Sequence, residues 1–198
     1  MESKNIRFEG NCYSPEWEEE AKKRGLPIAH STQEALALFL VPENRELLSR
    51  MGIFTEREIE GYYETRLEQY VKTLDIEMNV MESMVRNGIL PAISSHITSE
   101  GTALSYVPER AREGSSSRWL DHIEELYRIK EGLLDGAARL ASLRNSLSSL
   151  DLEERASDLT EKGIPIMDGI RGMCDAAEVL VGSGLWPYPT YCDILMGK

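Results

Sequence analysis

The amino-acid sequence predicts an all-α fold: a bundle of three long antiparallel helices, one or more of them kinked at proline, with short N-terminal helices packed at one end. Two observations predict it. Over residues 55–183, apolar side chains recur every three or four positions, the spacing of the buried face of an amphipathic helix. No segment shows the alternation of apolar and polar residues that is typical of a β-strand flanked by turns.

Residues 1–54 are predicted to form a junction segment of short helices. Serine caps a helix, proline suits a first turn, and glycine ends a helix because it tolerates a left-handed backbone. The predicted starts are Ser14-Pro15, the capping box Ser31–Glu34 and Pro42, and the first and third helices end at Gly25 and Gly52. Helices this short need tertiary contacts to be stable.

Residues 55–183 are predicted to form the long-helix bundle. Thr55 and Glu58 make a capping box at the start of the first long helix. Its apolar stripe comprises Ile59, Tyr63, Leu67, Tyr70, Leu74, Met78, Met81, Val85, Ile89, Ile93 and Ile97. Asn87-Gly88 and Pro91 interrupt the pattern, but the stripe keeps its phase across them. We therefore expect one helix with a kink at Pro91 rather than two helices.

The second and third long helices follow a segment, residues 108–117, that is predicted to be a loop. The second helix is expected from Arg118 to Leu147, and Asp151 caps the third, which Pro165 bends. The stripe of the second helix comprises Leu120, Ile123, Leu126, Leu133, Ala137, Leu140 and Leu147, and that of the third Leu152, Ala156, Leu159, Ile166, Ile170, Met173, Ala177 and Leu180.

Residues 184–198 are predicted to form a docking tail within what is one structural domain overall. Two prolines stiffen this segment, so its aromatic rings lose little further entropy when they dock. With one tryptophan from the junction segment, the candidate docking residues are Trp17, Trp186, Tyr188 and Tyr191.

The composition narrows the possible partners and locations. With 34 acidic and 22 basic residues, the net charge of −12 argues against a nucleic-acid partner. No apolar run approaches the roughly 20 residues of a membrane helix, and the N-terminus lacks the apolar core of a secretory signal, so a cytoplasmic location is expected. The three cysteines have no metal-ligand spacing and are expected to be free thiols.

No motif in the sequence predicts catalysis by this chain. A glycine-rich phosphate loop and a dinucleotide fingerprint are both absent. His30, His96 and His122 lie far apart and are not spaced as metal ligands. The methionines Met78, Met81 and Met84 favour core packing over a partner groove. Catalytic, cofactor-binding and metal-binding residues are accordingly assigned as none.

Four segments, in the same order, resemble the C-terminal region of type III glutamine synthetases. They are residues 7–17 with 20–27, residues 70–77, residues 89–92 with their proline, and the closing 185–191, Leu-Trp-Pro-Tyr-Pro-Thr-Tyr. The resemblance implies the helical region of a large enzyme that joins ammonia to glutamate, using ATP and divalent metal ions. It also implies that the metal and phosphate ligands precede Arg7, so no cofactor is expected on this chain. We expect an excised domain rather than a standalone protein.

Three functions remain open at this point. The first is a domain for oligomer assembly, since the resemblance implies stacked rings; its partners would be the catalytic domains and neighbouring subunits, and the isolated chain would be an acidic monomer or dimer. This function expects Trp17, Trp186 and Tyr191 to be exposed in the isolated chain. The second is a regulatory or protein-binding module, standalone or appended, which loses its surface if Met78 and Met81 are buried. The third is an enzyme with a site assembled from dispersed residues.

Overall fold

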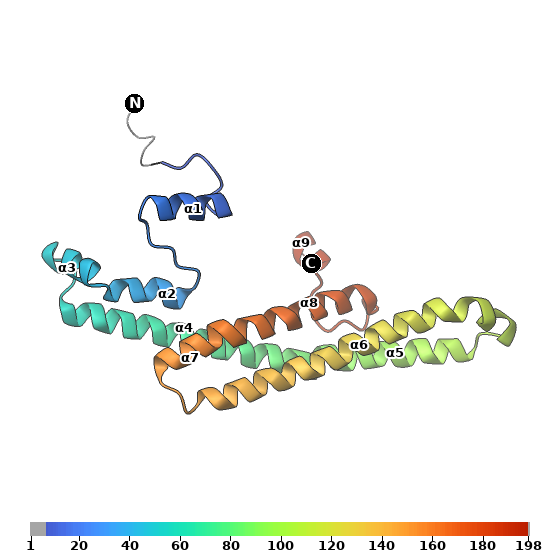
Figure 1. The fold of residues 1–198 in the computed structure, drawn as a ribbon. Helices are drawn as coiled ribbons and strands as arrows, with labels where there is room; N and C mark the ends of the chain where they lie inside the picture. Colours follow the sequence, from blue (N-terminus) through green and yellow to red (C-terminus); the bar gives the residue numbers. More distant parts are fainter. Residues whose placement is uncertain (1–6, 198) are drawn as a thin grey trace. The chain divides into compact units, whose positions relative to one another are not determined.

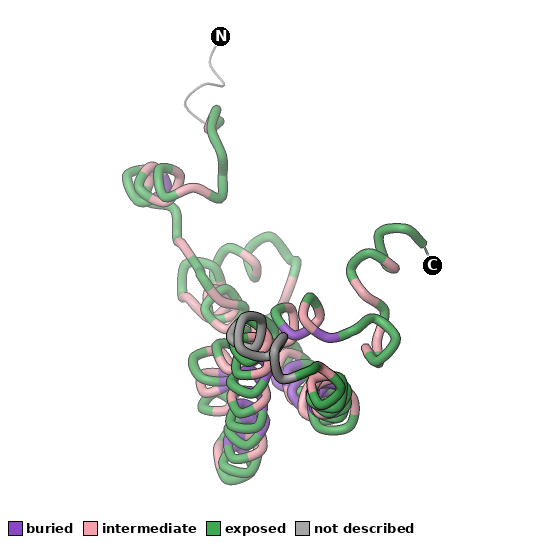
Figure 2. Tube along the Cα trace, turned by 90° about the vertical axis from the view of Figure 1, so that its right-hand side faces the viewer, coloured by how far each residue is buried: buried purple, intermediate pink, exposed green. Residues whose placement is uncertain are grey.

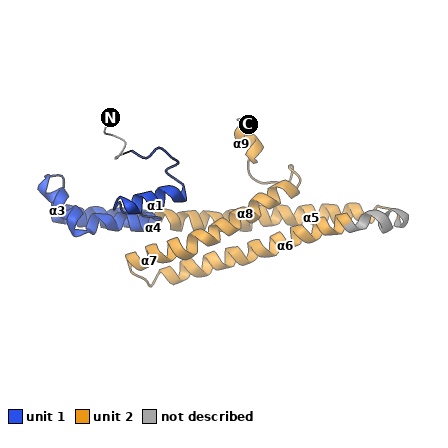
Figure 3. Ribbon diagram, turned by 45° about the horizontal axis from the view of Figure 1, so that its top comes forward, with its two compact units in different colours: residues 1–70 blue, residues 71–198 orange. Residues whose placement is uncertain are grey.

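The computed structural model describes residues 7–197, and of residues 109–117 only the backbone. Every regular element in this part of the chain is a helix, which confirms the all-α prediction (Figure 1). The elements are α1 (Pro15–Lys23), α2 (Thr32–Ala37), the 3₁₀ turn η2 (Leu38–Leu40), α3 (Pro42–Arg50), α4 (Glu56–Met84), the π turn η3 (Val85–Ile89), α5 (Leu90–Ser105), α6 (Glu109–Leu147), α7 (Leu152–Asp158), the π turn η4 (Leu159–Gly163), α8 (Ile164–Leu180) and α9 (Tyr191–Met196). The chain divides into two compact units, residues 1–70 and 71–198 (Figure 3).

The short helices of the first unit begin and end where the sequence predicts. Ser31 Oγ accepts a hydrogen bond from the Glu34 backbone N–H at 3.1 Å. The Glu34 carboxylate in turn accepts a hydrogen bond from the backbone N–H of His30 at 2.7 Å, one residue earlier than in a standard capping box. Gly25 and Gly52 have φ values of +70° and +67°, so each supplies the left-handed residue that ends its helix.

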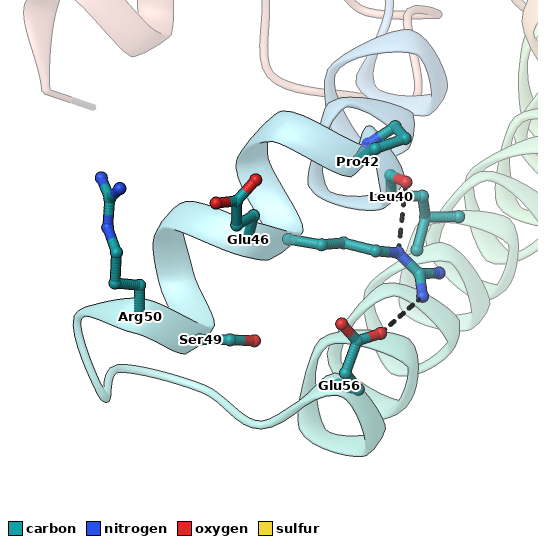
Figure 4. Close-up of a pocket in the computed structure, with 7 residues that line it drawn as sticks. Leu40, Pro42, Glu46, Ser49, Arg50 and Glu56 are labelled. Atoms are coloured by element: carbon teal, nitrogen blue, oxygen red, sulfur yellow. Dashed lines mark hydrogen bonds and ion pairs between the residues drawn. The ribbon is translucent and has the colours of Figure 1, made fainter.

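Arg45 ties α3 to the beginning of α4. Its Nη1 lies 3.3 Å from Glu56 Oε2, and its Nε donates to the carbonyl of Leu40 at 3.1 Å (Figure 4). The same Nη1 lies 3.0 Å from Glu60 Oε1. A surface hollow of about 660 Å³ lies beside this network, and Glu46 and Arg50 of α3 are among the residues that line it (Figure 4). The Arg45 guanidinium is already occupied by chain groups, so it offers little to a ligand in the hollow.

In the second unit, α6 is the central helix. It packs against α5 and, over a longer stretch, against α8, and the chain reverses direction between these helices (Figure 1). Among the described residues, the buried apolar residues of this unit are Val71, Leu74, Met78, Val85, Ile89, Leu90, Ala92, Ile93, Leu126, Ile129, Leu133, Ala137, Leu140, Leu143, Leu147, Ala156, Leu159, Met167, Ile170, Ala177 and Val181. Most of these positions belong to the predicted stripes, which therefore form the contacts between the helices.

A π turn precedes each of the two helix prolines. In η3 the N–H of Leu90 bonds to the carbonyl of Val85, five residues back, and Pro91 follows directly. The turn η4 stands in the same relation to Pro165. A wider turn relieves the clash of a proline ring with the preceding turn. The chain stays helical from Glu56 to Ser105, which confirms the prediction of one helix across Pro91.

Two details of the second long helix were predicted wrongly. The segment predicted as a loop, residues 108–117, is helical from Glu109 onward. Pro108 occupies the N-cap, where its missing N–H costs nothing, and the residues directly after it are good helix formers. Leu120, assigned to the buried stripe, is exposed, so the core face of α6 begins further along the helix.

Candidate docking site

The C-terminal tail folds back onto its own unit, and Tyr188 is its first anchor. The Tyr188 hydroxyl donates a hydrogen bond to the carbonyl of Met84 at 3.2 Å. Its ring lies against Gly88, in the π turn, so closely that a Cβ added at Gly88 would lie 2.5 Å from the hydroxyl oxygen. In the sequence, Gly88 is recognised only as an interruption of the helical pattern. In the structure, its missing side chain makes room for the ring of Tyr188.

Tyr191 is the second anchor and docks on α8. Its backbone N–H donates to Glu178 Oε1 at 3.0 Å, and its hydroxyl donates to Asp175 Oδ1 at 3.2 Å. The Arg171 guanidinium donates to the same hydroxyl oxygen and lies over the ring, with Cζ 5.5 Å from the centroid. The hydrogen bond that Arg171 donates to Tyr191, followed by the one it donates to Asp175, raises the pKa of Arg171 above its ordinary value.

A capping box closes the tail. The Thr190 hydroxyl accepts a hydrogen bond from the Asp193 N–H, and the Asp193 carboxylate accepts from the Thr190 hydroxyl and N–H. These bonds hold the pKa of Asp193 below its usual range. The tail is exposed or intermediate (Figure 2), and none of residues 182–197 is buried.

Between α4–η3, α8 and the tail lies an apolar groove of about 870 Å³. Its lining includes Ile76, Val80, Met81, Met84, Trp186, Tyr188, Tyr191 and Ile194. Ile76 is 62% exposed, Val80 48% and Met84 38%, although all three are apolar. They recur at every fourth residue, so they form one ridge along α4. We call this ridge and the lining around it the α4 groove.

The comparisons with known proteins identify the family. Residues 1–104 match the family model described as glutamine synthetase C-terminal domain. This chain belongs to that family. It is 29% identical to the type-3 glutamine synthetase of Dictyostelium discoideum over 96% of its own length. It is also 28% identical to the glutamine synthetases of Butyrivibrio fibrisolvens and Bacteroides fragilis, over 97% and 99% of its length.

The glutamine synthetase C-terminal domain is only one part of these relatives. The chain spans 26% of the Dictyostelium protein and 28% of each bacterial protein. Among the described residues, no three His, Cys, Asp or Glu side chains are grouped so that they could hold a metal ion. No described helix combines the length and apolar content needed to cross a lipid bilayer.

Of the four predicted docking residues, three meet at the α4 groove. Trp186 and Tyr188 are half-buried there, and Tyr191 is 46% exposed. Trp17 belongs to the first unit, where its ring lies 4.9 Å from that of Phe8 and 6.0 Å from the Arg24 guanidinium carbon. Both tryptophans are therefore partly covered by the domain itself. Of the three rings at the groove, Tyr191 is the most exposed.

The methionines divide between core and surface. Met78 is fully buried, as core packing requires. Met81 is half-buried and Met84 is exposed, and both line the groove, so the expectation of core packing was wrong for Met84. The exposed ridge was missed at the level of sequence. Its signal is present, however, because Ile76, Val80 and Met84 form a second apolar series displaced from the core stripe.

Two histidines that are distant in sequence also meet. His96 Nε2 on α5 lies 3.5 Å from His122 Nε2 on α6, and the N–H of Gly182 points to His96 Nδ1 at 3.5 Å. A neutral His96 ring that accepts at Nδ1 carries its proton on Nε2, the nitrogen that faces His122. A metal on Nε2 would require the proton on Nδ1, against the Gly182 N–H. The pair therefore acts as a link between helices.

Cys174 lies at the groove and is expected to be the slowest thiol of the chain. Burial, followed by the charge of Asp175, raises its pKa from 9 to about 11, so little thiolate is present near neutral pH. Cys12 and Cys192 are exposed. In titration with an aromatic disulfide reagent at about pH 8, we expect two fast thiols and a third at least roughly tenfold slower. In urea, the three thiols should react at similar rates. Three equal rates in the native protein would contradict the burial of Cys174.

Removing the Tyr188 side chain should release the tail. The Tyr188→Ala variant loses both the hydrogen bond to Met84 and the ring on Gly88. A hydrogen bond of about 1 kcal/mol corresponds to roughly fivefold faster local opening. We expect at least this increase in hydrogen–deuterium exchange over residues 185–196. Tyr106→Ala, at an exposed ring outside the groove, is the control and should leave exchange in the tail unchanged.

Proposed function

We propose that this chain is the non-catalytic C-terminal domain of a type III glutamine synthetase-like enzyme and that it serves oligomer assembly. The parent reaction is the ATP-dependent joining of ammonia to glutamate. The proposal assigns ATP and the divalent metal ions to the catalytic part of the parent and no cofactor to this chain. The observation that carries it is the coverage: nearly the whole chain matches about a quarter of each of three glutamine synthetases.

The groove supports a role in contacts between subunits or domains. Monomeric proteins rarely leave a continuous apolar surface uncovered unless it is a site of interaction. The α4 groove joins an apolar ridge to aromatic rings that are already held in place by hydrogen bonds. Held rings dock with a small entropic cost. We further propose the catalytic domains and neighbouring subunits as partners, and the cytoplasm as the location.

Native mass spectrometry of the catalytic part of the parent, with and without this chain, tests the assembly role. We expect the catalytic part alone to give small species and the mixture to give rings that contain the chain. Equal ring masses in both samples would overturn the assembly role. The chain alone should form no glutamine from glutamate, ammonia and ATP.

A second candidate is a protein-binding or regulatory module, either standalone or appended. The exposure of the α4 ridge favours it, because such a ridge suits an amphipathic helix of another protein. This function becomes the preferred one if rings form equally well without the chain.

A further inference from the structure

The shape and charge of the α4 groove, and not only its apolar character, indicate what kind of segment binds in it. Its exposed ridge, Ile76, Val80 and Met84, lies along one α-helix with a spacing of four residues. Ridges of this kind pack between the side-chain rows of a second helix. The ridge extends over about 12 Å, at 1.5 Å per residue, which is roughly two turns of such a partner.

The charged groups around the groove determine which charge on the occupant is favoured. The charged lining residues are four carboxylates and one cation: Glu77, Asp168, Asp175, Glu178 and Arg171. Arg171 is already bonded to Asp175 and Tyr191, so it offers little to an acidic partner. Asp175 and Glu178 are likewise bonded to Tyr191, so the acidic character presented to an occupant comes mainly from Glu77 and Asp168. The rim therefore favours basic side chains on the occupant. It also disfavours a second copy of this chain, because two acidic rims would face each other.

The lining is able to adapt to a helix. Met81, Met84 and Met167 line the groove, and unbranched methionine side chains adjust their shape to an incoming apolar residue. The fixed rings of Tyr188 and Tyr191 close one side.

We propose that the α4 groove binds an amphipathic α-helix whose apolar face lies on the Ile76–Val80–Met84 ridge and whose flanks carry lysine or arginine. This inference deepens the proposed assembly role and rests on it in one respect: a glutamine synthetase subunit is the expected carrier of the helix.

The probe is an acetylated, amidated leucine–lysine peptide of about 15 residues, with leucine at helical spacing, labelled for fluorescence anisotropy. We expect binding to the whole chain in the micromolar range. Val80→Asp should weaken it at least tenfold, because the charge falls on the centre of the ridge. Val179→Asp is the matched control, since Val179 on α8 is 84% exposed and does not line the groove, and it should leave binding unchanged.

The same pair of variants separates the groove from general attraction to an acidic protein. Non-specific attraction would strengthen slightly in both variants, because each adds a negative charge. Equal affinity in Val80→Asp and Val179→Asp would therefore overturn the proposal. So would equal binding of a peptide with glutamate in place of lysine. Circular dichroism checks the fold of each variant, and Ile76→Asp replaces Val80→Asp if the latter does not fold.

Sedimentation of the chain alone tests the competing occupant. A dimer that Val80→Asp dissociates would place a second copy in the groove and overturn the proposal. These outcomes are independent of the ring assay. If the chain promotes ring formation but does not bind the peptide, the inference about the groove is wrong and the assembly role is unaffected.

Discussion

Replacing Leu133 with alanine is expected to lower the free energy of unfolding by about 2–5 kcal/mol. Leu133 is fully buried on α6, the helix that packs against both α5 and α8. Truncation removes apolar contacts and leaves a cavity that the surrounding helices fill only in part. Urea titration of the full chain, followed by circular dichroism, measures the loss.

The neighbouring residue supplies the control. Leu134 is the next residue of the same helix and has the same side chain as Leu133, but it is exposed. Leu134→Ala should change the free energy of unfolding by no more than about 0.5 kcal/mol. Similar losses for the two variants would mean that the centre of the unit does not lie on the Leu133 face of α6.

Much of the fold could be predicted from sequence because the deciding signals are local. The capping box at Thr55–Glu58 involves residues three apart and forms as predicted, and Asp151 caps its helix as predicted. The three- and four-residue periodicity needs only one helix to be recognised, and it correctly assigned most of the buried positions. The prediction failed at residues 108–117, where polar composition was interpreted as a loop. A long helix tolerates serines and one glycine when the residues around them favour helix.

The contacts that shape the groove could not be predicted because they join residues far apart in the chain. Tyr188 reaches Met84 and Gly88 across about a hundred residues, and His96 meets His122 from another helix. Nothing in a single sequence specifies such pairs. The aromatic tail was predicted as a docking element, and it does dock, on its own unit. The exposed apolar surface of the α4 groove can be identified only after the docked positions of these rings are known.

A second group of non-local contacts is expected to control stability through close helix packing. On α6, Gly132 and Gly136 face α8. A Cβ on Gly136 would lie 2.7 Å from Cγ1 of Ile170, and one on Gly132 would lie 2.5 Å from Sδ of Met173. Both distances are shorter than any ordinary contact, and Ile170 is buried, so it has little room to move. The absence of side chains at these two positions is what permits the approach of the helices.

Gly136→Leu should therefore lower the free energy of unfolding by about 1–3 kcal/mol, although leucine favours helix over glycine. The matched control is Gly172→Leu on α8, where a Cβ meets nothing within 4 Å. There the helix propensity acts alone, and the free energy of unfolding should rise by roughly 0.5–1 kcal/mol. The two substitutions are chemically identical, so opposite signs in urea titration isolate the effect of helix contact. A gain in both variants would show that α6 and α8 can separate at Gly136 without cost, against the close packing described here.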